Sequence, residues 1–153
     1  MIIYTDGSAH PNPGPGGYGV VVCDDDNNNI IDVYSHQENH TTNNEQELKA
    51  ILYTLIKYGK SNPTPIVYSD SSYAINTYTM WMYSWADRGW IKSDNKIPEN
   101  LELIKTYYSL REKGYQIDLR KIPGHKGIKG NEIADMLATN KMSVEEVMKK
   151  YGK

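Results

Sequence analysis

The sequence predicts one α/β domain, an α+β-like mixed sheet of five strands flanked by helices. Three strand-like segments come first, separated by short turn-forming loops, which favours an antiparallel meander. A helix, a strand, a helix, a strand and a helix then follow, which places helices on the faces of the sheet. We find no internal repeat and no linker, so the 153 residues are expected to share one core.

The three N-terminal strands are indicated by β-branched and aromatic residues bounded by turn signals. The first is expected to stop at Asp6-Gly7-Ser8, a turn-forming triplet. A Pro/Gly-rich loop and a polar turn are expected to separate the strands, over residues 11–17 and 24–29. The predicted strands themselves cover residues 2–5, 18–23 and 30–34.

The first helix has the clearest start signal. Thr42 followed by Glu45 fits a capping box, with Thr42 as the N-cap and Glu45 reaching back to it. The apolar residues that follow recur at helical spacing: Leu48, Ile51, Leu52 and Leu55.

The second half of the chain alternates strands with helices. Two further strands are predicted, one after a pair of prolines and one from strict alternation, over residues 66–68 and 115–119. Three further helices are predicted from apolar spacing, over residues 71–83 and 101–110 and from Asn131 onward. A loop over residues 123–130 precedes the last of these, and a charged, helix-prone tail begins at Ser143.

Composition excludes several classes of protein. The formal net charge of −2 gives no global positive field, so any nucleic-acid binding must use a local surface and bound cations. The single Cys23 excludes an intramolecular disulfide and a cysteine-based zinc site. The N-terminal apolar run breaks at Asp6 and no run approaches about 18 residues, so we expect a cytoplasmic protein without signal peptide or membrane span.

Four acidic residues lie where a fold of this class places its site. Asp6 follows the first predicted strand and Asp70 the fourth, so both project from one sheet edge if these strands are parallel neighbours. Glu47 flanks the apolar stripe of the first helix, and Asp135 lies one turn into the helix from Asn131. Each also has an ordinary alternative, which is a strand-closing turn, a solvated helix surface or an interaction with the helix dipole.

Convergence of these acids would require a cation. Unit charges about 4 Å apart repel by roughly 4 kcal/mol at an effective dielectric near 20. Carboxylate oxygens suit magnesium or manganese, and two such ions about 3.5–4 Å apart can activate water and stabilise the leaving oxygen in phosphodiester cleavage. Glu45 is the alternative to Glu47, but its capping position gives it a structural role.

Five motifs follow one another with compatible spacing from Tyr4 to about Ala138. They are Asp6-Gly7-Ser8, Asn12-Pro13-Gly14-Pro15-Gly16-Gly17-Tyr18-Gly19, Thr41-Thr42-Asn43-Asn44-x-x-Glu47-Leu48, Ser69-Asp70-Ser71, and Gly124-His125-x-Gly127-x-x-Gly130-Asn131-Glu132-x-Ala134-Asp135-x-Leu137-Ala138. Together they resemble type 1 ribonuclease H, the bacterial ribonuclease HI group. The resemblance implies a ribonuclease H-like fold with a domain over residues 1–141, a protruding handle at about 81–99, and a charged helical tail at 142–153 in the same domain.

The resemblance also implies an activity. It is endonucleolytic hydrolysis of the RNA strand of RNA–DNA hybrids by two Mg²⁺ ions, for which Mn²⁺ substitutes, leaving 5′-phosphate and 3′-hydroxyl ends. The implied metal ligands are Asp6, Glu47, Asp70 and Asp135, and His125 is the implied residue for proton movement or product release. We expect a monomer.

Substrate contacts are implied at Asn12, Thr42, Asn43, Asn44, Ser72, Trp81 and Trp85. Asparagine offers both a donor and an acceptor to the 2′-hydroxyl, the group that separates RNA from DNA. The tryptophans of the handle could pack against the DNA sugar–phosphate track, and core packing is the alternative for at least one of them.

The chain departs from the family pattern where substrate is held. Ser72 stands where a Gln is common, and His40 stands where an Arg often helps hold a DNA phosphate. The handle is often strongly basic in bacterial members, but here its charges cancel: Arg88, Lys92 and Lys96 against Asp87, Asp94 and Glu99. These departures weaken expected substrate contacts and leave the four acids intact.

Two other functions remain open. One is a catalytically silent hybrid-binding module, and the other is a different nuclease on the same fold, such as a junction resolvase or a transposase core. The presence of all four acids favours an enzyme, and the Thr-Thr-Asn-Asn and Gly-His-x-Gly motifs favour ribonuclease H.

Overall fold

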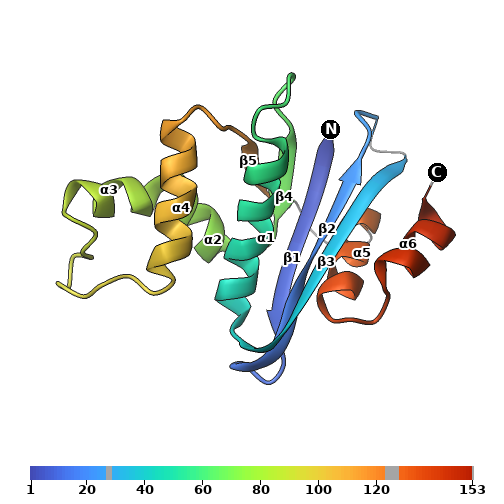
Figure 1. Cartoon of the computed structure of the whole chain (residues 1–153), viewed down its shortest axis with the longest axis horizontal. Coiled ribbons are helices and arrows are strands. Elements are labelled where there is room, and N and C mark those ends of the chain that lie inside the picture. The colour runs from blue at the N-terminus through green and yellow to red at the C-terminus, as the bar shows by residue number, and fades with distance from the viewer. Residues whose placement is uncertain (27–28, 123–127, 153) are drawn as a thin grey trace.

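The computed structural model describes residues 1–26, 29–122 and 128–152 and shows a mixed sheet between two layers of helices (Figure 1). Its strands are β1 (Ile2–Ala9), β2 (Gly14–Cys23), β3 (Ile30–Thr41), β4 (Ile66–Ser69) and β5 (Asp118–Lys121), in the order β3-β2-β1-β4-β5. The first three strands pair antiparallel, whereas β4 pairs parallel with both β1 and β5. The predicted five-stranded mixed sheet is confirmed, and β1 and β4 are parallel neighbours.

The three N-terminal strands are longer than their sequence signals. β1 runs through Asp6-Gly7-Ser8, which is therefore not a turn, and pairs with β2 as far as Ala9 and Gly16. Residues 14–17, predicted as loop, belong to β2, and β3 continues from the predicted end at residue 34 to Thr41. Residues with low intrinsic strand preference are held here because the neighbouring strand satisfies their backbone groups.

The helices are α1 (Asn43–Tyr58), α2 (Ser72–Asn76), η1 (Thr77–Trp81), α3 (Met82–Asp87), α4 (Leu101–Glu112), α5 (Lys129–Ala138) and α6 (Val144–Tyr151). The predicted helix over residues 71–83 is a continuous run of α2, a π-helical turn and α3, which ends four residues later than predicted. The fifth strand was predicted over residues 115–119, but β5 begins at Asp118. Alternation there marked burial rather than strand pairing, because Ile117 packs in the core without belonging to β5.

The start of α1 follows the predicted cap in one respect and differs in another. The Thr42 side chain accepts a hydrogen bond from the Glu45 backbone N–H at 3.1 Å, which confirms Thr42 as the N-cap. The Glu45 carboxylate accepts a hydrogen bond from the hydroxyl of Thr41 at the end of β3. The predicted hydrogen bond to it was from the backbone N–H of the N-cap residue, Thr42. Glu45 therefore ties the helix start to the strand before it, and its structural role stands.

Both faces of the sheet are buried, and alternate residues of each central strand go to opposite faces. Ile3 and Val20 pack in one cluster with α1, α2 and α4. Tyr4 and Val21 pack in a second cluster with α5 and α6. Figure 1 shows the same arrangement, with α5 and α6 on the opposite side of the sheet from α1 and α4.

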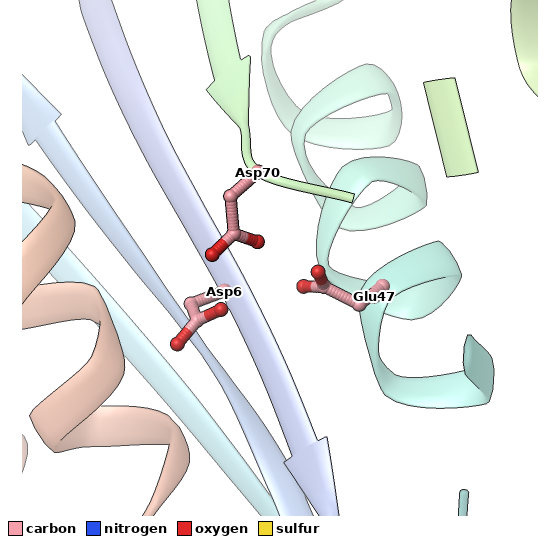
Figure 2. A group of neighbouring side chains, drawn as sticks. All are labelled: Asp6, Glu47 and Asp70. Carbon is pink, nitrogen blue, oxygen red and sulfur yellow. The ribbon is translucent and has the colours of Figure 1, made fainter. Parts of the chain in front are cut away.

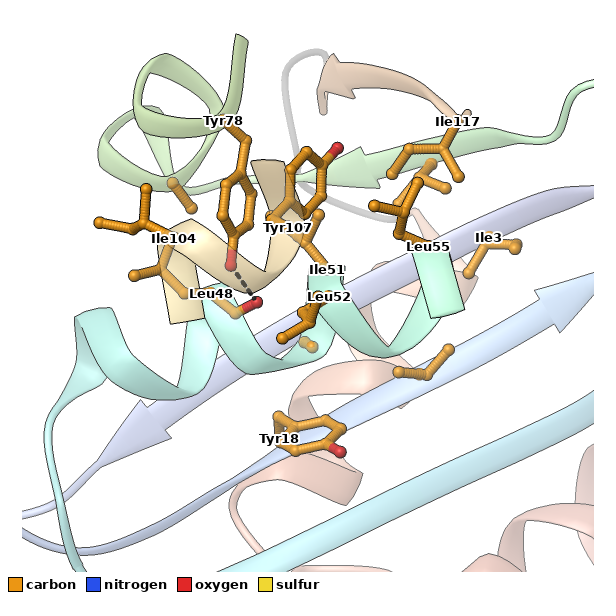
Figure 3. Packing of buried hydrophobic residues seen from close by; sticks show 14 of the residues in the cluster. Ile3, Tyr18, Leu48, Ile51, Leu52, Leu55, Tyr78, Ile104, Tyr107 and Ile117 are labelled. Atoms are coloured by element: carbon orange, nitrogen blue, oxygen red, sulfur yellow. Dashed lines mark hydrogen bonds between the residues drawn. The ribbon is translucent and has the colours of Figure 1, made fainter. Parts of the chain in front are cut away.

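Tyrosine takes the place of phenylalanine in the core, since the chain has 13 Tyr and no Phe. The rings of Tyr78 and Tyr107 stack with their centroids 3.7 Å apart between η1 and α4 (Figure 3). The buried Tyr78 hydroxyl donates to the Leu48 carbonyl of α1 at 2.9 Å, so the polar end of the ring is satisfied.

Across the described parts of the chain, none of the helices combines the length and the apolar character needed to cross a membrane.

Candidate active site

Three carboxylates from three elements meet at the edge where β1 passes the end of β4 (Figure 2). Asp6 lies within β1, Asp70 directly follows β4, and Glu47 reaches over from α1. One oxygen of each lies within 4.8 Å of the oxygens of the other two. The parallel pairing of β1 with β4, the condition on which Asp6 and Asp70 were expected to meet, brings Asp70 to Asp6, although Asp6 lies inside its strand and not at its end.

Two glycines allow the helices to come close to Asp6. A β-carbon on Gly7 would lie 2.4 Å from the backbone nitrogen of Glu47, so the absence of a side chain lets α1 approach β1. Gly19 is the register partner of Asp6 on β2, and a β-carbon there would lie 2.4 Å from the carbonyl oxygen of Ala134 in α5. The glycines of two predicted motifs therefore act by helix–strand contact, with the consequence that Glu47 and α5 flank Asp6.

Asp135 stands beside this group on the side of Asp6. It lies on α5, is half-buried, and lines both clefts that the acids open into. Its carboxyl group interacts with that of Asp6 and contributes to raising the pKa of Asp6. The fold therefore brings all four predicted acids to one place, with Asp6, Glu47 and Asp70 as the tightest set.

The carboxyl groups cannot all ionise at neutral pH without a cation. Burial raises the pKa of Asp6 from 3.8 to about 8, with further contributions from Asp70 and then Asp135. Burial also raises the pKa of Glu47 well above its ordinary value, and the charges of Asp6 and Asp70 add to the effect. A perturbation of this kind is typical of sites that hold a cation or a proton.

The side chains fit a divalent metal ion. Among the described residues, the Oε1 atom of Glu47 is buried and has no hydrogen-bond partner. A buried carboxylate oxygen without a donor is costly, and a bound cation would satisfy it. Clustered carboxylate oxygens are the donor set that Mg²⁺ and Mn²⁺ prefer.

The predicted asparagines line the same site. Asn43 and Asn44 lie with Glu47 and Ser71 around a cleft of about 380 Å³ that also includes Asp6. Asn43 Oδ1 accepts from the Ala9 backbone N–H at 2.6 Å, and the Asn43 N–H donates to Asn12 Oδ1 at 3.1 Å. These two bonds fasten the β1–β2 turn to the start of α1, so Asn12 and Asn43 have a structural function alongside any contact with substrate.

Lys121 is a neighbour of the site that the sequence did not indicate. Its ammonium group donates to the Asp70 carbonyl oxygen at 2.6 Å and to Ser72 Oγ at 2.8 Å. It thereby joins the end of β5 to the corner that carries Asp70. The signal was missed because the predicted fifth strand ended at residue 119, two residues before Lys121.

The two tryptophans predicted to contact substrate lie away from the acids. Trp81 is 39% exposed at the end of η1, and Trp85 is half-buried on α3 against the core. Their rings lie 6.1 Å apart and line a shallow cleft with Arg88 and Lys92. Core packing, the alternative for at least one tryptophan, is confirmed for Trp85. His125 lies outside the described residues.

A sheet in the order β3-β2-β1-β4-β5 with acidic residues where β1 meets β4 defines the class of ribonuclease H-like nucleases. The chain belongs to the ribonuclease H family, because the family model described as RNase H matches residues 1–143. It is 39% identical over 138 residues to the ribonuclease H of Orientia tsutsugamushi, covering 90% of this chain and 79% of that protein. It is 36% identical to the ribonuclease H of Rickettsia typhi, covering 99% of this chain and 97% of that protein.

Solved structures give the same assignment. LC11-RNase H1 in complex with RNA/DNA hybrid is 26% identical with a TM-score of 0.67, covering 96% of this chain and 98% of the other. The PFV RNase H domain, at 22% identity and a TM-score of 0.77, covers 91% of this chain and 92% of its own and supports the fold alone.

Proposed function

We propose that the protein is an endonuclease that hydrolyses the RNA strand of RNA–DNA hybrids, leaving 5′-phosphate and 3′-hydroxyl ends. The observation that carries the proposal is the convergence of Asp6, Glu47 and Asp70 within 4.8 Å, with Asp135 beside them. Membership of the ribonuclease H family supports the choice of substrate, as does the LC11-RNase H1 structure with bound RNA/DNA hybrid.

The four acids are proposed to hold two Mg²⁺ ions, for which Mn²⁺ substitutes. When bound, such ions supply an activated water and stabilise charge on the leaving oxygen of the phosphodiester. Asp6 and Glu47 are positioned for this by burial, since strand and helix leave their side chains little freedom. Asp70 is exposed and faces the open side, where a phosphate can approach.

Other residues of the chain are proposed to orient the substrate. Asn44 and Asn43 line the cleft beside Glu47 and can select the RNA strand through its 2′-hydroxyl, with Asn12 and Thr42 holding the turn and helix start in place. Lys121 holds the backbone at Asp70 through its hydrogen bond to the Asp70 carbonyl, and it also donates a hydrogen bond to the hydroxyl of Ser72. The handle at residues 81–99 is proposed to contact the duplex through the exposed face of Trp81, with Trp85 beneath it.

His125 is proposed to move protons or to aid product release. His125→Ala should slow turnover by about 10²–10⁴-fold if it acts as a general acid or base, and by less if it aids release only. Single-turnover cleavage compared with steady-state turnover separates the two roles, because a release defect leaves the single-turnover rate unchanged. Unchanged rates in both assays would remove His125 from the site.

The decisive experiment presents three labelled substrates side by side: an RNA–DNA hybrid, a double-stranded RNA and a four-way DNA junction. We expect Mg²⁺-dependent cleavage of the hybrid RNA only, abolished by excess chelator, leaving a 3′-hydroxyl on the upstream fragment and a 5′-phosphate on the downstream fragment of each cut. Junction cleavage would point to a resolvase, and tight hybrid binding without cleavage would point to a silent binding module. A monomer is expected in sedimentation of the purified chain, and fractionation of the source cells tests the expected cytoplasmic location.

A further inference from the structure

The larger cleft at the carboxylates extends beyond them to the C-terminal helix. It has a volume of about 480 Å³ and is lined by Asp6, Asp70 and Asp135 together with Lys129 and Tyr151. Tyr151 is the last residue of α6 and lies beyond residues 1–143, the part that the family model matches.

Lys129 is the one cation among the described residues that line this cleft. Its ammonium group lies 4.9 Å from the centre of the Tyr151 ring, which is a cation–π arrangement. No salt bridge within the described parts of the chain involves Lys129. A carboxylate partner would cancel the charge of the lysine, whereas an aromatic ring orients the ammonium group and leaves its charge available.

The Tyr151 ring is held in place by the anchoring of α6. Ser143 and Glu146 form a complete capping box at the start of the helix, with bonds of 3.1 and 2.9 Å. Val147 in the middle of the helix is fully buried against the sheet. After Tyr151, Gly152 forms a parallel bridge to Ile30 at the start of β3. Both ends of α6 are thus anchored, which keeps Tyr151 beside Lys129.

We propose that Lys129, supported by Tyr151, binds a phosphate of the RNA strand next to the one that is cut. The cleft is otherwise acidic, so a polyanion entering it needs a local cation in addition to any metal ion. Lys129 lines the same cleft as these acids, so a strand that enters the cleft can bring a phosphate to its ammonium group. This inference rests on the proposed function, and it assigns to α6 a share in holding the substrate.

Lys150 offers a matched control for charge and for the ring. Its ammonium group lies 5.2 Å from the same Tyr151 ring, but Lys150 does not line the cleft. Lys129→Gln and Lys150→Gln therefore remove the same charge beside the same ring. We expect Lys129→Gln to raise KM for the hybrid about fivefold with little change in kcat. That change lies between the effect of losing an exposed ion pair and the effect of losing a charge-assisted hydrogen bond. Lys150→Gln should leave KM within about twofold.

Salt dependence gives a readout that a structural defect would not produce. In an Asp70→Asn background, which removes cleavage, Lys129→Gln should lower the slope of log affinity against log salt by about one, and Lys129→Arg should restore it. Tyr151→Phe keeps the ring and should match the wild type, whereas Tyr151→Leu should raise KM by about twofold because the lysine loses its support. Thermal unfolding of every variant monitors the fold.

The strand assignment is tested with a hybrid that carries one neutral methylphosphonate in its RNA strand beside the cut site. The effect of Lys129→Gln should disappear on that substrate and persist when the neutral linkage lies in the DNA strand. The reverse pattern, or equal behaviour of Lys129→Gln and Lys150→Gln on the natural hybrid, would overturn the inference and leave the proposed function standing. A wild-type protein that neither binds nor cuts the hybrid would instead overturn the proposed function.

Discussion

The carboxylates at the β1–β4 edge and the handle at residues 81–99 differ in how their side chains are held. Asp6 and Glu47 are only 8% and 7% exposed, and each lies within a regular element that is paired or packed along its length. In the handle, Trp81 is 39% and Ile97 69% exposed. After α3 ends at Asp87, the described backbone continues without helix or strand until α4 begins at Leu101.

The contacts that secure the two regions differ in the same way. The edge is fixed by close backbone approach at Gly7 and by Lys121, which bonds to the Asp70 carbonyl. In the handle, Trp90 packs edge-on against Tyr108 of α4 with ring centres 5.3 Å apart. Reacting groups must be positioned within fractions of an ångström, whereas a duplex-binding surface tolerates variation. Substitutions at the edge should therefore change chemistry, and those in the handle should change binding.

The largest effect is expected from neutralising an acid at the edge. Asp6→Asn or Asp70→Asn should reduce cleavage by about 10³-fold, because a neutral amide cannot balance the charge of a metal ion. This loss is comparable with that caused by removing another group that stabilises charge in a transition state. Rates of hybrid cleavage in Mg²⁺ measure the loss, and circular dichroism monitors folding. Asp118→Asn, at the far end of β4 and β5, is the control and should keep its activity. Full activity of either edge variant would defeat the two-metal assignment.

The two glutamates of α1 separate catalysis from structure within one helix. Glu47→Gln should remove most activity, by about 10²-fold or more, because its buried carboxylate faces Asp6 and Asp70. Glu45→Ala should keep activity and lower the free energy of unfolding by about 0.5–2 kcal/mol, since it removes a contact at the helix start. Paired kinetic and urea-unfolding measurements test both. An inactive Glu45→Ala with an active Glu47→Gln would exchange the two roles.

The stability of the fold at high pH should depend on metal ions because of the carboxylates where β1 passes the end of β4. The pKa of Asp6 is raised from 3.8 to about 8 in the folded state, so without metal the folded chain binds more protons than the unfolded chain between these values. The stabilisation is fully present below about pH 4 and is lost as pH rises through about 8. Metal-free Tm should therefore fall across this range, and Mg²⁺ should raise Tm by at least about 3 °C at the alkaline end.

The measurement is calorimetry with and without Mg²⁺ across the pH range. Asp6→Asn lacks the titrating group and should show a flatter pH profile and a smaller response to Mg²⁺. A charge-neutral exchange in the handle, such as Arg88→Gln with Asp87→Asn, should keep the wild-type profile. A Mg²⁺ effect that is the same at every pH would contradict the link to Asp6.

The smallest effect is expected from recharging the handle. Its three basic and three acidic residues cancel, so it adds little net attraction for phosphates. Asp87→Lys with Asp94→Lys should lower KM, steepen the salt slope by roughly one to two units and leave kcat nearly unchanged. Asp26→Lys with Glu145→Lys makes the same charge change elsewhere and is the control. Equal affinity and slope in the recharged and the wild-type proteins would mean that the handle does not meet the duplex.

The sequence by itself determined the order of the elements, the cap at Thr42, the buried faces and the four acids. These features are local, because capping, turn formation and periodicity depend on residues within a few positions of each other. Asp6 and Asp70 were recognised at the ends of predicted strands, and Glu47 and Asp135 on predicted helices; the structure brings all four together. Asp6 and Asp70 meet because β1 and β4 are parallel neighbours. The sequence did not establish that pairing, so the meeting of the two acids could be predicted only if it held.

Only the tertiary structure decided how far the strands run and which distant residues meet. β1 passes through Asp6 to Ala9 because β2 completes its hydrogen bonds, and no local signal encodes a partner strand. Likewise, the pairing of β5 with β4 brings Lys121 to Asp70, 51 residues away in the sequence. The docking of α6 on β3 brings Tyr151 to Lys129, 22 residues away. Such contacts form when separate elements pack on a common sheet, so their energy is absent from any short stretch of the chain.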